Sequence, residues 1–298
     1  MPSAPTDERV IVGVEGTDAG RLAVAWAADE AVLHGRPLRL IRALDWPLGA
    51  DENLAPKAPW DTWRSRYRSA NRQVLDEARA AVLERHPGLD VDERLIDGLA
   101  ERVLGEASGD AFLTVLGSRH LSSLREAFTT GSVAVPVIAH ASCPVAVIRC
   151  VENTGAVPPT VVVGVDGSRG ADLAWEHACE EAALRGASVL AIFAYTIALS
   201  MGATAMLADA ALRDARETLA HSVDTWRARY PGIPIVGDVR LGHPVRVLTD
   251  ASEDALLLVV GNRGIGGFRR MLLGSVSHGL VHNARCPLVV VPGGASEA

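Results

Sequence analysis

The sequence predicts an α/β protein made of two tandem doubly wound domains, each with a five-stranded parallel sheet flanked by helices. The first observation is the length of 298 residues, which suits two domains of ordinary size. The second is an internal repeat that spans nearly the whole chain. The third is a regular alternation of strand and helix patterns, which is typical of parallel sheets with helical crossovers.

The internal repeat consists of short segments that recur in the same order in both halves. The recurring segments are 11–17 (IVGVEGT) with 162–168 (VVGVDGS), 113–117 (LTVLG) with 257–261 (LLVVG), and 143–147 (CPVAV) with 286–290 (CPLVV). Each copy has the length of a complete domain. We therefore expect a first domain at 8–151 and a second at 159–293, joined by a short segment with Pro and Gly at 152–159.

The second half shows its elements clearly. Thr160–Val165 is a β-branched run without a polar break, which predicts a strand buried on both faces. Ser168 can cap a helix that runs to about Leu184, and Gly186 follows its end. The apolar segment 189–194 predicts the next strand.

The rest of the second half continues the alternation. A long helix is predicted at 205–230, because apolar residues recur at helical spacing and Pro231-Gly232 follows. The later elements are expected to be a strand at 235–241, a short helix at 245–252, a strand at 255–260, a helix at 275–283 and a final strand at 288–291. In a doubly wound sheet of this kind, ligands bind at the carboxyl ends of the strands.

Composition and charge exclude several classes of function. The formal net charge of −7 argues against a general nucleic-acid-binding protein, which needs a basic face. Lys57 is the only lysine and it follows no glycine, so no P-loop of the GxxxxGK[ST] type exists. The polar N-terminus resembles no secretory signal, and no apolar run is long enough to span a bilayer. We therefore expect a cytoplasmic protein with neither a nucleic-acid partner nor a membrane partner.

A glycine-rich loop after the fourth strand of the second half carries the strongest chemical signal. Gly261 and Gly264 permit close backbone approach, and Arg263 adds positive charge. Gly274 and Ser275 open a helix whose first N–H groups can bind an anion. The pattern favours a cradle for a polyphosphate. A glycine-rich turn that merely reverses the chain would show the same glycines.

Asp166 comes directly after the first strand of this half and faces the same end of the sheet. A carboxylate there can accept hydrogen bonds from ribose hydroxyls or adenine, or help to hold a metal ion. It can equally serve as a turn residue before the helix.

These segments together resemble the universal stress protein family. The resemblance rests on 163–168 (VGVDGS), on the G-x2-G-x9-G-S spacing at 261–275 and on the Cys-Pro pair before the last strand, and it covers both halves. It implies a parallel sheet of strand order 3-2-1-4-5, with ATP, and Mg²⁺ on its phosphates, between the first and fourth strands.

By this resemblance, adenine meets the backbone of Ala194, the ribose lies at Gly261, and the phosphates lie at Gly264 and at 274–277. No separate metal site of the protein is expected. The residues that we expect at the nucleotide in the second half are Gly164, Asp166, Ser168, Ala194, Gly261, Arg263, Gly264, Gly274, Ser275, Val276 and Ser277.

The first half departs from the family pattern. Glu15 stands where the second half has aspartate, His120 stands where it has the second glycine, and the loop is one residue longer. A non-glycine residue at a positive φ costs about 1–2 kcal/mol, so we expect a degenerate site. The corresponding residues are Gly13, Glu15, Ala43, Gly117, Arg119, Gly131, Ser132 and Val133.

The resemblance implies an ATP-binding regulatory protein of a stress or dormancy response, with ATP as ligand or signal. No clear general base or nucleophile accompanies the loop, so we expect no catalytic residue and at most slow ATP hydrolysis. Two alternatives stay open. One is a dimeric interaction scaffold of the same fold that needs no nucleotide, and the other is an enzyme that transfers adenylyl groups or binds a flavin.

The short final strands, at 145–148 and 288–291, are strongly apolar. In a 3-2-1-4-5 order each lies at a sheet edge, where unpaired backbone groups need a partner. We therefore expect the two halves to pair as an intramolecular pseudo-dimer, with further association into a homodimer as an open possibility.

Overall fold

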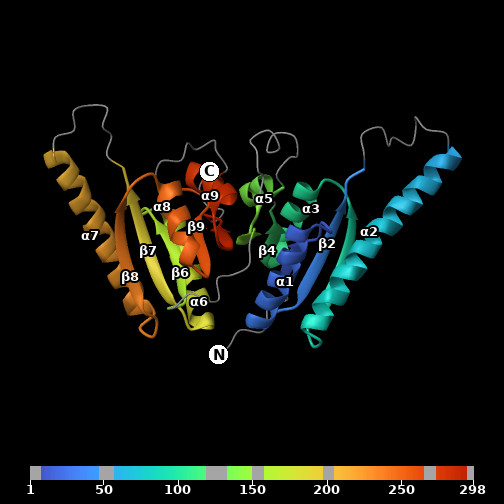
Figure 1. The fold of residues 1–298 in the computed structure, drawn as a ribbon, viewed down its shortest axis with the longest axis horizontal. Helices are drawn as coiled ribbons and strands as arrows, with labels where there is room; N and C mark the ends of the chain where they lie inside the picture. The colour runs from blue at the N-terminus through green and yellow to red at the C-terminus, as the bar shows by residue number, and fades with distance from the viewer. Residues whose placement is uncertain are drawn as a thin grey trace. The chain divides into compact units, whose positions relative to one another are not determined.

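The computed structural model describes residues 8–46, 57–118, 133–149, 158–196, 205–264 and 273–293. Contacts divide the chain into two units, which meet in sequence between Ile148 and Arg149. Each unit is an α/β domain with five parallel strands flanked by helices (Figure 1). The domain bounds expected from the sequence, 8–151 and 159–293, stay a prediction, as does the pairing of the final strands of the two halves.

In the first unit the strands alternate with helices. Its elements are β1 (Arg9–Gly13), α1 (Asp18–Leu33), β2 (Leu38–Leu44), α2 (Lys57–Arg85), β3 (Val91–Asp97), α3 (Ala100–Ala107), η1 (Ser108–Asp110), β4 (Ala111–Gly117), α5 (Ala134–His140) and β5 (Val145–Ile148). All of its strands are parallel, and they lie in the order β3-β2-β1-β4-β5.

The second unit repeats this arrangement. Its elements are β6 (Thr160–Val165), α6 (Arg169–Arg185), β7 (Ser188–Tyr195), α7 (Ala205–Arg229), β8 (Ile235–Leu241), α8 (Pro244–Ala251), η3 (Ser252–Asp254), β9 (Leu257–Gly261), α9 (Ser275–Asn283) and β10 (Leu288–Val291). Its parallel strands lie in the order β8-β7-β6-β9-β10. The predicted fold class and the predicted strand order 3-2-1-4-5 are confirmed in both units.

The predicted elements of the second half differ from the observed ones mainly at their ends. The helix α8 begins at Pro244, one residue earlier than expected, because the fixed φ of proline suits the first helical turn. The strand β9 begins at Leu257, later than the expected residue 255. The residues Ser252–Asp254 form a 3-10 turn that continues α8 and delays the strand.

The core of each unit lies on both faces of its sheet. In the second unit, β6 and β9 are buried on both sides, with Val161, Val163 and Leu257 at 0% exposure. The indole of Trp175 on α6 is 1% exposed and stacks on Trp226 of α7, with ring centroids 5.9 Å apart. Because β6 and β9 are packed on both faces, the positions of their carboxyl ends are fixed by the core.

The long second helix of each unit lies along the outermost strand: α2 packs on β3, and α7 packs on β8 (Figure 1). Within the described ranges, no helix combines the length and the apolar character that a membrane span requires. The expected cytoplasmic location stays a prediction.

Candidate functional site

A cavity of about 430 Å³ opens at the carboxyl ends of β6 and β9 in the second unit. Every residue expected at the nucleotide in this half lines it: Gly164, Asp166, Ser168, Ala194, Gly261, Arg263, Gly264, Gly274, Ser275, Val276 and Ser277. Their contact with a ligand stays a prediction, whereas their convergence on one cavity is a property of the fold.

The residues at the carboxyl end of β6 form the first wall of the cavity. Gly167 turns the chain with a φ of +80°, a conformation that favours glycine. Asp166 Oδ1 accepts a hydrogen bond from the backbone N–H of Ser168 at 3.0 Å. Ser168 Oγ in turn accepts from the N–H of Ala171 at 3.2 Å and caps α6. The turn therefore fixes the Asp166 carboxylate at the rim of the sheet.

The end of β9 supplies the second wall, where two backbones come close together. A Cβ on Gly261 would lie 2.7 Å from the carbonyl carbon of Gly170, in the first turn of α6. A side chain at Gly264 would likewise meet the Asp166 carboxylate. These glycines are required because the loop, the helix start and the carboxylate crowd into one place.

Asn262 organises this loop, and the sequence patterns did not single it out. Its side chain is 5% exposed, and its Oδ1 accepts from the N–H of Gly293 at 3.0 Å. Its backbone N–H donates to Val291 O at 2.8 Å, and its carbonyl accepts from the N–H of Gly274 at 2.8 Å. A polar amide at the end of an apolar strand was the available signal, because a buried amide must find partners.

The first turn of α9 supplies backbone N–H groups as hydrogen-bond donors to the cavity. Gly274 precedes the helix with φ −70° and ψ 152°, and no side chain caps the helix end. The first N–H groups of a helix have no acceptor within the helix, so those of Ser275, Val276 and Ser277 are oriented to bind an anion. The Ser277 hydroxyl donates to Gly261 O at 2.8 Å, which ties the helix to the loop.

The N–H of Gly274 does not belong to this donor set, because it donates to Asn262 O. The part expected of Gly274 therefore rests on its missing side chain rather than on a hydrogen bond. Among the described lining residues, Asp166 and Arg263 are the charged ones. The Arg263 side chain is exposed at the mouth of the cavity.

The sequence patterns missed the apolar walls of the cavity. These lining residues are Val165, Ala171, Ile192, Pro244, Leu248, Val260 and Leu273. Ile192 lies two residues before Ala194 on β7, so strand alternation was a usable signal for it. Pro244 and Leu248 come from α8, and only the tertiary fold brings them to this edge of the sheet.

In the first half the structure describes part of the corresponding set. Gly13 ends β1, Ala43 lies near the end of β2, Gly117 ends β4, and Val133 precedes α5. Glu15 Oε2 accepts from Thr17 Oγ1 at 3.3 Å, so this carboxylate is turned toward the start of α1. Arg119, His120, Gly131 and Ser132 lie outside the described residues.

Comparison with known proteins gives a consistent result. The model of the universal stress protein family matches residues 8–149 and, a second time, residues 159–292. The chain is 32% identical over 289 residues to universal stress protein Rv2005c of Mycobacterium tuberculosis, which covers 94% of this chain and 96% of that protein. It is 33% identical over 297 residues to Rv2623 of the same species, covering 97% and 98% of the two chains.

Solved structures agree on the fold. A universal stress protein from Archaeoglobus fulgidus superposes with a TM-score of 0.70 at 17% identity, covering 98% of both chains. The functionally unknown protein PA1789 from Pseudomonas aeruginosa superposes with a TM-score of 0.61 at 16% identity, covering 96% of this chain and 92% of that one. With the family model matched twice and relatives that span nearly the full length, the chain belongs to the universal stress protein family, in its tandem two-domain form.

Proposed function

We propose that the second unit binds ATP in the 430 Å³ cavity, and that the protein regulates a stress or dormancy response with ATP as ligand or signal. The observation that carries the proposal is the convergence of a glycine-rich loop, a helix start and a carboxylate on one cavity at the carboxyl edge of the sheet. Such cavities have the usual size and position of small-molecule sites in doubly wound folds.

The nucleoside end of the cavity suits adenine and ribose. Ile192, Leu248 and Val260 offer apolar surface to a planar base. The backbone of Ala194 lies at the end of β7, where it can hydrogen-bond the base edge. Asp166 supplies a carboxylate acceptor for hydroxyl groups at the carboxyl end of β6.

The other end of the cavity suits phosphates. The N–H groups of Ser275–Ser277 point from the positive end of the α9 dipole, and Arg263 adds a positive charge. Mg²⁺ usually keeps several waters and is held by phosphate oxygens with one or two carboxylates. Asp166 is the one carboxylate among the described lining residues that could take this part, and the ion would neutralise phosphate charge.

The same residues favour binding over catalysis. Phosphoryl transfer needs a positioned nucleophile or base in line with the phosphate. Among the described lining residues, the Ser168 hydroxyl caps α6 and the Ser277 hydroxyl donates to the loop. This leaves the Ser275 hydroxyl, and the described lining includes no histidine or lysine that could activate it. The proposed protein therefore senses or stores ATP, with slow hydrolysis at most.

The test combines identification of the ligand that copurifies with the protein and a variant that lacks one backbone N–H group. Ligand released from freshly purified full-length protein is identified by mass spectrometry, and ATP affinity is measured by titration. Ser275→Pro removes one N–H donor at the first position of α9, where proline fits and where Gly274 already has the conformation that proline requires before it. Ser275→Ala is the matched control, because it removes the hydroxyl and keeps the N–H.

We expect adenine nucleotide in the released fraction and a loss of affinity of roughly 10- to 100-fold for Ser275→Pro, the size of one charge-assisted hydrogen bond. Ser275→Ala should bind nearly as the unchanged protein does. Equal affinities for Ser275→Pro and the unchanged protein would reject the phosphate position. Absence of any nucleotide affinity in the folded protein would favour the nucleotide-independent scaffold.

A further inference from the structure

The strand β8 ends the sheet of the second unit and, in the part of the chain that the structure describes, pairs only with β7. Pro234 O accepts from the N–H of Val189, and Tyr195 O accepts from the N–H of Gly242. The even-numbered residues of β8 therefore direct their backbone groups toward β7. Because this direction alternates along a strand, the N–H and C=O groups of Gly237, Val239 and Leu241 face away from the sheet.

The side chains of β8 divide between the two faces in the same alternating way. A Cβ on Gly237 would lie 2.9 Å from a methyl of Val223, so the odd-numbered positions face α7. On the other face, Arg240 Nε lies 2.7 Å from Asp238 Oδ2. The face of β8 toward α7 contains a hollow, and the opposite face carries the ion pair between Asp238 and Arg240.

The hollow lies where the edge of β8 meets α7. It measures about 400 Å³. Its lining combines apolar residues, among them Ala220 and Val223 of α7 with Gly237 and Val239 of β8, with the charged residues Arg216, Asp224, Arg227 and Asp238. On the same strand, Leu241 exposes 60% of its surface. The strand β8 thus carries the exposed Leu241 and, four residues earlier, Gly237, whose missing side chain leaves space in the hollow.

We propose that β8 pairs antiparallel with β8 of a second copy of this chain, about a two-fold axis at Val239. In this register the outward backbone groups of Val239 meet their own copies, and those of Gly237 meet those of Leu241. The uncovered Leu241 then lies over the hollow beside Gly237 of the second copy. A two-fold axis repeats each of these contacts, so the interface is self-complementary.

The charges on the opposite face agree with this register. Pairing about Val239 sets Asp238 of one copy directly opposite Arg240 of the other, and the reciprocal pair forms as well. Opposite charges at facing positions of an antiparallel pair are stabilising, whereas like charges there are destabilising. At the start of the strand, the Arg227 guanidinium donates to Ile235 O at 2.7 and 3.1 Å, which closes the edge before the proposed pairing begins.

The equivalent edge of the first unit is the strand β3, and its charges disfavour such pairing. The residue of β3 that corresponds to Val239 is Leu95, and a two-fold axis there would set Glu93 opposite Asp97 of the second copy. Glu93 also pairs with Arg72 at 3.4 Å and with Arg79 at 3.2 Å. Natural proteins use inward or lateral charges of this kind to block sheet edges.

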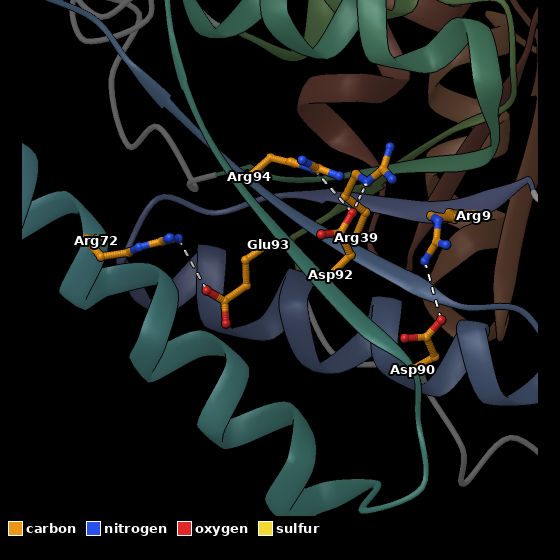
Figure 2. A network of polar contacts seen from close by, with 7 residues as sticks. All are labelled: Arg9, Arg39, Arg72, Asp90, Asp92, Glu93 and Arg94. Carbon is orange, nitrogen blue, oxygen red and sulfur yellow. Dashed lines mark hydrogen bonds and ion pairs between the residues drawn. The ribbon is translucent and has the colours of Figure 1, made fainter.

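Figure 2 shows the charged network around β3, with dashed contacts from Asp92 to Arg39 and Arg94, and from Glu93 to Arg72. The pKa of Asp92, which burial alone would raise, is held below its usual value by the two guanidinium groups. The two outer edges therefore differ: the charges along β3 oppose antiparallel pairing with a second copy, whereas those of Asp238 and Arg240 on β8 are complementary to their own copies.

The experiment measures association of the full chain by sedimentation velocity over a concentration series. We expect the unchanged protein to dimerise, and Asp238→Arg and Arg240→Asp each to weaken the dimer roughly tenfold, because two symmetric attractive pairs become repulsive. An equimolar mixture of the two variants should dimerise again, because every new charge then faces its opposite in the other chain. This rescue requires contact between chains, which a change within one strand cannot produce.

The matched control is the exposed pair Arg246 and Asp250 on α8, where Arg246→Asp and Asp250→Arg should leave association unchanged. Thermal unfolding confirms that each variant is folded. A monomeric unchanged protein throughout the series overturns the proposal. So does a dimer that the β8 variants leave unaltered, or a pair of weakened variants that mixing fails to rescue.

Discussion

At the end of β9, the Gly261 backbone lies against Gly170, and this approach leaves no space for a side chain. We expect Gly261→Ala to lower the free energy of unfolding by about 1–3 kcal/mol, the usual cost of overpacking. Chemical denaturation checks this value. Gly232→Ala is the control, because nothing lies within 4 Å of a Cβ at that position. Equal stabilities of the two variants would show that the crowding is relieved cheaply.

Asp29 on α1 forms an ion pair with Arg85 and contacts His86. Arg85 Nε and Nη2 each lie 2.7 Å from its carboxylate, and His86 Nε2 lies 2.7 Å from Oδ1. Burial alone would raise the pKa of Asp29, but these partners hold it below the ordinary value of 3.8. A carboxyl group whose folded pKa is lowered stabilises the fold above its unfolded pKa.

We therefore expect Asp29→Asn to be less stable than the unchanged protein at neutral pH, and the difference to shrink as the pH falls below the unfolded value of 3.8. The measurement is denaturant unfolding of both proteins from neutral to acidic pH. A constant difference over that range would contradict the assignment of the stabilisation to the ionised carboxylate. High salt should reduce the effect, because the pair is partly exposed.

The helices that follow the first strand of each unit begin in the same way. Thr17 Oγ1 accepts from the N–H of Gly20 at 3.1 Å and caps α1, as Ser168 caps α6. We expect Thr17→Ala to lower the free energy of unfolding by about 1 kcal/mol, the typical value of an N-cap. Thr17→Ser keeps the acceptor oxygen, and in thermal unfolding it should stay close to the unchanged protein. A Thr17→Ser variant as unstable as Thr17→Ala would assign the loss to the missing methyl group.

At the scale of elements, the strands and helices of the second half were predictable because their signals are local. A β-branched run predicted β6, and the Pro231-Gly232 pair marked the end of α7. The short 3-10 turn at Ser252–Asp254 was not predicted, because three residues carry no periodicity. The ion pairs of Asp92 with Arg39 and of Glu93 with Arg72 were not predicted either, because these two arginines lie on β2 and α2, far from β3 in the sequence.

The whole molecule shows which part of a site a sequence can predict. The meeting of the turns after β6 and β9 at one cavity was predictable, because glycine spacing and a carboxylate after a strand have a direct physical meaning, whereas their contact with a nucleotide stays a prediction. The contributions of Pro244 and Leu248 were not, because each depends on contacts between distant segments. The two units share one topology, so the difference expected between their sites comes from a few loop residues.

That difference leads to a prediction for the full chain: one ATP bound per chain, at the second unit. The second half keeps Gly264 and Asp166, whereas the first has His120 and Glu15 at the corresponding positions. Glu15 also has one methylene more than Asp166, and its carboxylate accepts from Thr17 Oγ1. Calorimetric titration of the full-length protein gives the stoichiometry directly.

Two matched variants locate the bound nucleotide. Ser275→Pro in the second half should abolish most of the measured binding, because it removes an N–H donor from the start of α9. Ser132→Pro, the same change at the corresponding position of the first half, should leave affinity and stoichiometry unchanged. Two equivalent sites per chain, or a loss of binding in Ser132→Pro alone, would show that the first unit carries a working site despite His120.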